Sequence, residues 1–157
     1  MRHLILAAAI VAYPAAAQDQ TGELNLICVG GGSANKATSG TVTGWSSSGE
    51  FASGTVRSSR SVGFEDQVGI RITGEEGRLR MPRTMLPPIR GGEDGWFKLK
   101  NIEYSDGEIT ASVSVNPTNN PKLRLDRYAG AVSLSGKAGD FVGQCKKFDP
   151  ATTARQF

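Results

Sequence analysis

Two cysteines, one near each end of the chain, constrain the fold more than any other feature of this sequence. Cys28 lies in the run Glu23–Val29, and Cys145 lies in the run Phe141–Cys145. Apolar and polar residues alternate in both runs, as in β-strands that bury one face, and each cysteine falls in the apolar phase. We therefore expect a Cys28–Cys145 disulfide that joins the first and last strands of one domain, with Cα atoms within about 7 Å.

The N-terminal residues have the features of a secretory signal peptide. A basic start is followed by the apolar run Leu4–Val11 and by the small residues Ala15–Ala17 of a cleavage site. The apolar run is far shorter than the roughly 20 residues of a membrane-spanning helix, and an exported protein favours paired cysteines. The sequence therefore predicts a periplasmic or secreted protein, with a signal peptide over 1–17, a β domain over 18–147 and a flexible tail over 148–157.

Short alternating segments separated by turn residues cover most of the remaining chain. Gln67–Thr73 is the clearest strand, and Asp106-Gly107 is a typical hairpin turn. The apolar phase of Trp96–Tyr104 changes near Asn101, which predicts a β-bulge. The glycine-rich run Gly30–Ser33 is expected to interrupt the first strand as a flexible loop. It does not match a phosphate-binding motif. The ten expected strands are 23–29, 41–45, 51–57, 67–73, 78–81, 96–104, 109–115, 122–125, 131–135 and 141–145.

Hairpin after hairpin in this order favours an all-β antiparallel meander of about eight to ten short strands. We expect a closed or nearly closed β-barrel, with a β-sandwich as the alternative. The larger aromatic side chains are expected to pack in its core or rim rather than to stack on sugars. These are Trp45, Trp96, Tyr104 and Tyr128.

Missing residue types exclude several kinds of chemistry. The single histidine, His3, falls within the predicted signal peptide, which excludes Ser-His-Asp and Cys-His catalysis and His-containing zinc sites in the exported domain. The formal charge of +3 is too small for a nucleic-acid-binding protein. Acidic pairs such as Glu75-Glu76 lie at expected turns, where they favour turn formation. We therefore expect no enzyme activity, cofactor, metal or nucleic-acid partner.

Basic residues are concentrated between Arg71 and Lys100. If the strands of this stretch are neighbours, their outward side chains form a cationic patch beside the Pro82–Gly95 loop. Arginine in such a patch can bind carboxylate or phosphate groups through two parallel hydrogen bonds. A solvated outer face that nearby carboxylates neutralise is the competing interpretation. The candidate binding residues are Arg78, Arg80, Arg83, Arg90 and Trp96.

Three functional hypotheses follow. The first is a non-enzymatic binding or accessory protein of the cell envelope that contacts an anionic glycan, a lipid headgroup or a protein partner. The second is an inhibitor of a secreted hydrolase, such as lysozyme or a protease, and the third is a hydrolase with two carboxyl groups facing each other across a cleft. An apolar barrel interior wide enough for a ligand would instead favour a carrier of lipids or other hydrophobic molecules.

Overall fold

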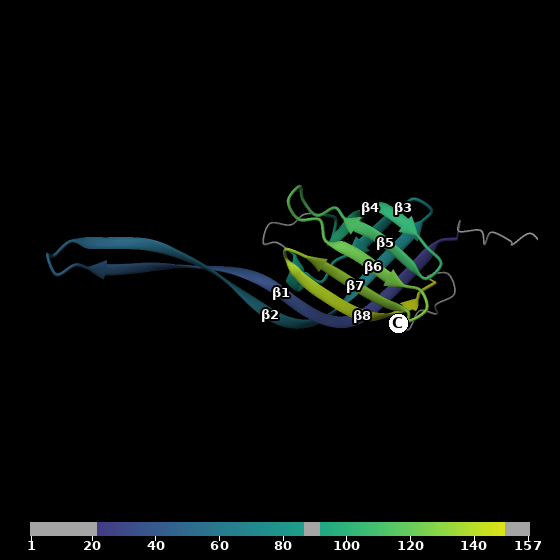
Figure 1. The fold of residues 1–157 in the computed structure, drawn as a ribbon, viewed down its shortest axis with the longest axis horizontal. Helices are drawn as coiled ribbons and strands as arrows, with labels where there is room; N and C mark the ends of the chain where they lie inside the picture. The colour runs from purple at the N-terminus through teal and green to yellow at the C-terminus, as the bar shows by residue number, and fades with distance from the viewer. Residues whose placement is uncertain (1–21, 87–91, 150–157) are drawn as a thin grey trace, which may run out of the picture.

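The computed structural model describes residues 22–86 and 92–149, which form eight antiparallel strands in a closed barrel (Figure 1). Each strand pairs with the next along the chain, and β1 also pairs with β8, so the ring has no gap. The predicted signal peptide and residues 150–157 of the predicted tail lie outside the described residues. The elements are β1 (Leu24–Trp45), β2 (Phe51–Thr73), β3 (Glu76–Arg80), the 3-10 helix η1 (Arg83–Met85), β4 (Trp96–Tyr104), β5 (Glu108–Val113), β6 (Lys122–Asp126), β7 (Ala131–Gly136) and β8 (Gly139–Lys147).

Side chains that point into the ring are apolar. Every second residue of β2 from Val68 to Ile72 is buried, and β5, β6 and β7 alternate in the same way. Among the described residues no polar or charged residue is buried. The alternation places one face of each strand in a common interior, where apolar burial stabilises the fold. The predicted all-β meander is confirmed, and the barrel rather than the sandwich forms.

The predicted disulfide joins the two strands that close the ring. Cys28 and Cys145 are directly opposite in the β1–β8 ladder, and their Cα atoms are 3.9 Å apart. The bond spans 117 residues of sequence. If its effect is treated as lost chain entropy of the unfolded state, it stabilises the fold by somewhat more than about 4 kcal/mol.

The prediction of a loop at Gly30–Ser33 is wrong, because β1 runs through these residues without interruption. The reason is the close approach of β8. A Cβ atom on Gly30 would overlap the carbonyl oxygen of Val142, and one on Gly32 would overlap that of Asp140. Glycine is required here because its missing side chain lets two backbones approach, and not because the chain turns.

β1 and β2 are much longer than the short strands that the sequence predicts. The expected strands 23–29 and 41–45 merge into β1, and 51–57 and 67–73 merge into β2, which reduces ten strands to eight. β1 leaves the barrel at Asn35, whose N–H donates to the Ala138 carbonyl.

Residues 35–61, the projecting arm, then form a hairpin that extends away from the barrel (Figure 1). The pairing is continuous from Asn35↔Ser61 to Trp45↔Phe51, and the arm is roughly 35 Å long at about 3.3 Å per residue. At its base the Ser33 N–H and hydroxyl both donate to Asp140 Oδ1, at 3.0 and 2.6 Å. These hydrogen bonds hold the pKa of the Asp140 carboxyl below its usual range.

The predicted β-bulge in β4 is confirmed. The β4–β5 register shifts between Lys100 and Glu103, and Asn101 has a φ of +52°. Phe97 and Leu99 are buried before the bulge, whereas Tyr104 pairs with the buried Ile109 after it. The bulge thus turns the Tyr104 side chain inward. Because Tyr104 is the last residue of β4, it lies at the barrel end opposite the arm.

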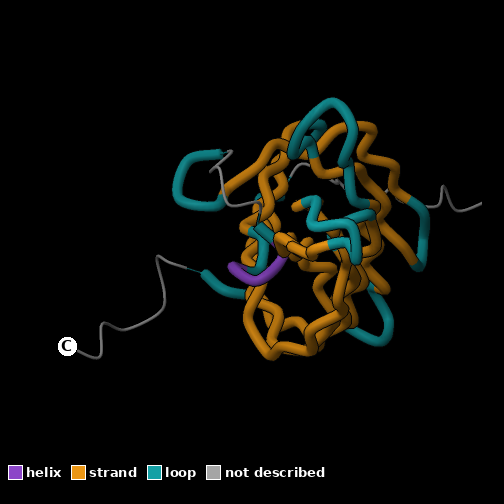
Figure 2. Tube along the Cα trace, turned by 90° about the vertical axis from the view of Figure 1, so that its left-hand side faces the viewer, coloured by secondary structure: helices purple, strands orange, loops and turns teal. Residues whose placement is uncertain are grey.

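The two ends of the barrel differ. At the arm end η1 follows β3, and Met81 and Met85 are 3% and 2% exposed, so they cover the core there. Figure 2, turned by 90° from Figure 1, shows η1 against the ring of strands. At the other end the turns between strands surround an open mouth. No helix in the described ranges is both long and apolar enough to cross a bilayer.

We expect Gly30→Ala to lower the free energy of unfolding by more than about 2 kcal/mol, because its Cβ has no space beside β8. Gly40→Ala is the matched control, since a Cβ on this arm residue meets nothing within 4 Å. Urea unfolding followed by circular dichroism measures both variants. Equal unfolding midpoints would contradict the close approach of β1 and β8.

Candidate functional site

The outer faces of β2, β3 and β4 bring three cations into one line. Arg71 is directly opposite Arg78, and Arg78 is directly opposite Lys98. We call these three exposed residues the basic row. Like charges directly opposite each other on neighbouring strands are destabilising. The row therefore creates a positive potential on one side of the barrel that a bound anion would relieve.

Trp96 holds one end of the basic row in place. The Arg71 guanidinium lies over the indole ring, with Cζ 5.1 Å from the ring centroid, which is a cation–π contact. Gly69 makes room for the ring, because a Cβ there would lie only 3.1 Å from the indole. Arg80 is directly opposite Trp96 and adds a further exposed guanidinium beside the row.

One carboxylate counters the row within the described residues. Arg78 Nη2 and Glu93 Oε2 are 2.6 Å apart. The hydrogen bond and charge of Arg78, followed by the charge of Lys98, hold the pKa of Glu93 below its ordinary value. Both partners are exposed, so the pair adds little to stability. Its effect is to keep Glu93 deprotonated and Arg78 partly neutralised.

The structure brings Arg78, Arg80 and Trp96 together, as the sequence predicts for neighbouring strands. Arg83 is exposed on η1, and its backbone N–H donates to Asp66 Oδ2 at 2.9 Å. Arg90 lies outside the described residues, as do the other residues of 87–91 in the Pro82–Gly95 loop. Ligand binding by these five residues stays a prediction.

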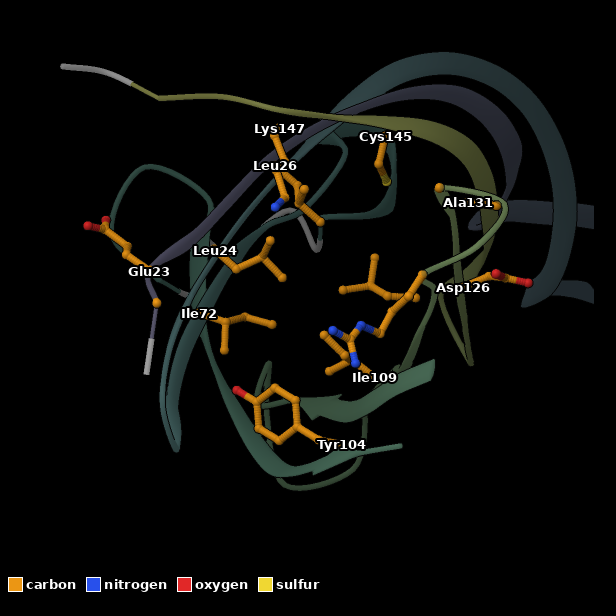
Figure 3. Close-up of a pocket in the computed structure, with 14 residues that line it drawn as sticks. Glu23, Leu24, Leu26, Ile72, Tyr104, Ile109, Asp126, Ala131, Cys145 and Lys147 are labelled. Carbon is orange, nitrogen blue, oxygen red and sulfur yellow. The ribbon is translucent and has the colours of Figure 1, made fainter. Parts of the chain in front are cut away.

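A cavity of about 530 Å³ opens at the barrel end opposite the arm (Figure 3). Its walls are the apolar side chains of Leu24, Leu26, Ile72, Ile109 and Leu125. Pockets of this size can hold a small organic ligand. The rim is polar and is formed by Glu23, Tyr104, Asp126, Arg127 and Lys147.

Three of the polar rim groups form hydrogen bonds within the chain itself. Tyr104 Oη donates to the Gly74 carbonyl, and burial raises the pKa of this phenol. Arg127 Nη1 donates to the Ser105 carbonyl at 3.1 Å. Asp126 Oδ1 accepts the N–H groups of Tyr128 and Ala129, which orders the β6–β7 turn.

Two carboxylates border the cavity, but they do not face each other. Figure 3 shows Glu23 and Asp126 on different sides of the mouth, with their carboxylate oxygens pointing away from its centre. Glycoside hydrolysis by paired carboxyls requires both groups to flank the substrate, and this pair does not.

Among the described residues no three His, Cys, Asp or Glu side chains gather where they could hold a metal ion.

The aromatic side chains do not all pack as the sequence predicts. Trp96 is half-buried, but Trp45 is 74% exposed at the end of the arm and Tyr128 is 84% exposed in the β6–β7 turn. The expected strands 41–45 and 51–57 form as parts of β1 and β2, but the sequence did not indicate that they leave the barrel. The available signal was an alternating pattern with glycine, serine and threonine in place of large core residues.

Comparison with family models, with curated proteins and with solved structures found no match.

We expect Arg78→Ser to raise the pKa of Glu93 towards the ordinary carboxyl value, because the hydrogen bond and the nearest positive charge are both lost. A titration of the Glu93 carboxyl by NMR measures this change. Arg124→Ser is the control, since it breaks the Arg124–Glu108 ion pair and leaves Glu93 in place. A Glu93 pKa that stays unchanged in Arg78→Ser would contradict the ion pair.

Proposed function

We propose that this chain is a non-enzymatic binding or accessory protein of the cell envelope, exported to the periplasm, that contacts an anionic partner through the basic row. The alignment of Arg71, Arg78 and Lys98 supports this proposal most directly. Three cations in register need compensating charge, and the described chain supplies one ion-paired carboxylate, Glu93. The disulfide and the signal-like start of the sequence support export.

The spacing of the cations favours a partner with several negative groups. Neighbouring strands lie about 4.8 Å apart, so the row crosses roughly 10 Å. Arg80 and Lys100, each two residues from the row along β3 and β4, extend the positive surface along the strands. A polymer or surface with repeated phosphate, carboxylate or sulfate groups can meet these cations together, and each arginine can bind an oxyanion bidentately.

The double variant Arg78→Ser/Lys98→Ser is expected to elute from immobilised heparin, a sulfated polyanion, at clearly lower salt than the unaltered protein. The reason is the loss of two adjacent charges from the row. Lys137→Ser/Lys146→Ser is the matched control, because it removes two exposed charges elsewhere on the barrel. Equal shifts for the two variants would mean that net charge alone causes retention, which would contradict the assignment.

The cavity at the barrel mouth supports a second candidate function, the carriage of a small hydrophobic molecule. The inward side chains of β1, β2, β5 and β6 form apolar walls, and the rim above them is polar. A molecule with an apolar body and one polar end suits this arrangement, because its polar end could remain in contact with water.

If the cavity binds hydrophobic molecules, the fluorescence of N-phenylnaphthylamine should rise saturably with the protein. Leu26→Asp is expected to weaken binding at least about tenfold, because it places a charge on an apolar wall. Val29→Asp is the control on the same strand, since Val29 is 63% exposed and does not line this cavity. Non-saturable binding, or equal loss in both variants, would count against a carrier function.

A further inference from the structure

The projecting arm carries apolar side chains that nothing in the described chain covers. Trp45 and Phe51 are directly opposite each other at its end, 74% and 56% exposed, with ring centroids 5.1 Å apart. Val42 and Val56 on the arm are also exposed. A two-stranded hairpin without a third strand or a packed face is only marginally stable in water. The arm is therefore a segment that a partner would stabilise.

The face of the arm that carries the aromatic pair has a graded composition. The register places Thr43, Ser53, Thr41 and Thr55 behind the two rings, followed by Ser39 opposite Arg57. Moving from the tip towards the barrel, this face is therefore apolar, then rich in hydroxyl groups, then cationic. Arg57 is six residues from Phe51, about 20 Å along the strand.

The arm is also positively charged. It contains Lys36, Arg57 and Arg60 against the single carboxylate of Glu50, a formal charge of 3 − 1 = +2. Lys36 is directly opposite Arg60, so two of these charges repel each other across the hairpin. The ion pairs of the described chain, Arg78–Glu93 and Arg124–Glu108, involve none of the three cations. The charge of the arm is complementary to an anionic surface.

A lipid surface suits these features better than a protein pocket does. Tryptophan is enriched where a bilayer meets water, hydroxyl groups can hydrogen-bond with headgroups, and arginine attracts anionic lipids. A stable protein interface buries about 800 Å² on each side around well-packed anchors. The next pair on the same face, Thr43 and Ser53, is small and offers little such surface. Figure 1 shows the tip far from the barrel, where a flat surface can reach it unobstructed.

We propose that the arm docks on the surface of a bilayer that contains anionic lipids. Trp45 and Phe51 enter the interfacial region, and the hydroxyl groups and Arg57 of the same face meet the headgroups. Two rings alone give weak, reversible attachment, so binding also requires the electrostatic attraction. This site is separate from the basic row on the barrel wall, and neither proposal requires the other.

Tryptophan fluorescence of the disulfide-bonded protein tests the docking directly. The chain has two tryptophans, so Trp45 is the remaining reporter in a Trp96→Phe background. We expect its emission to shift to shorter wavelength with vesicles of phosphatidylcholine and phosphatidylglycerol, and brominated acyl chains to quench it. Pure phosphatidylcholine should give a much smaller shift. No shift with anionic vesicles would overturn the proposal.

Vesicle flotation with tip variants gives a second, independent readout. Trp45→Ala and Phe51→Ala are each expected to lower the partition coefficient about tenfold, because each removes a ring that docking would bury. Tyr128→Ala removes a still more exposed ring from the opposite end and should leave flotation unchanged. Arg78→Ser/Lys98→Ser should keep the Trp45 shift, which separates this site from the basic row.

Two results would count against docking of the arm tip on lipid. If Trp45→Ala/Phe51→Ala and Tyr128→Ala reduce flotation equally, the tip is not the docking site. If sedimentation velocity shows a dimer that Trp45→Ala/Phe51→Ala dissociates, and vesicles bind neither form, the arm pairs with a second copy of the chain. Either result would overturn the lipid assignment.

Discussion

The pairing of β1 with β8 is the contact on which the rest of the structure depends. It gives every strand of the ring two neighbours, and the Cys28–Cys145 bond lies directly across it. Without this seam both strands would present unpaired edges, which are templates for aggregation. The seam also fixes the arm, because β1 continues from the ladder with β8 straight into residues 35–45. Closure of the barrel and projection of the arm are consequences of the same strand.

Local patterns predicted the parts of the fold that local chemistry determines. The alternation of Gln67–Thr73 and the phase change near Asn101 correctly identified a strand and a bulge. Gly30–Ser33 was misread because glycine permits both a turn and a close approach, and only the distant residues of β8 decide between them. The merging of short strands into β1 and β2 was missed for a related reason. Serine, threonine and glycine give weak signals when a strand has no core to face.

The candidate site also combines features that the local sequence predicts with features that depend on distant residues. Sequence reasoning located the cationic stretch, but only the strand register reveals that Arg71, Arg78 and Lys98 form a row. Arg71 and Lys98 belonged to the expected cationic stretch but were not among its five candidate binding residues. Trp45 was expected to be packed, since a large aromatic residue usually is, and nothing in its neighbouring sequence shows that its strand leaves the barrel. The cavity forms where the ends of β1, β2, β5 and β6 meet, and the sequence alone does not predict which strand ends lie together.

The continuity of β1 from Cys28 to Trp45 has a mechanical consequence. A pull on the arm tip is transmitted along an unbroken strand into the barrel wall. There the hydrogen bonds to β8 lie across the direction of the pull and share the load in shear. Those bonds would have to slip together rather than open one by one, and behind them the covalent cross-link bears the remaining force. A pull on the tip would therefore be resisted at the β1–β8 seam, where the cross-link lies.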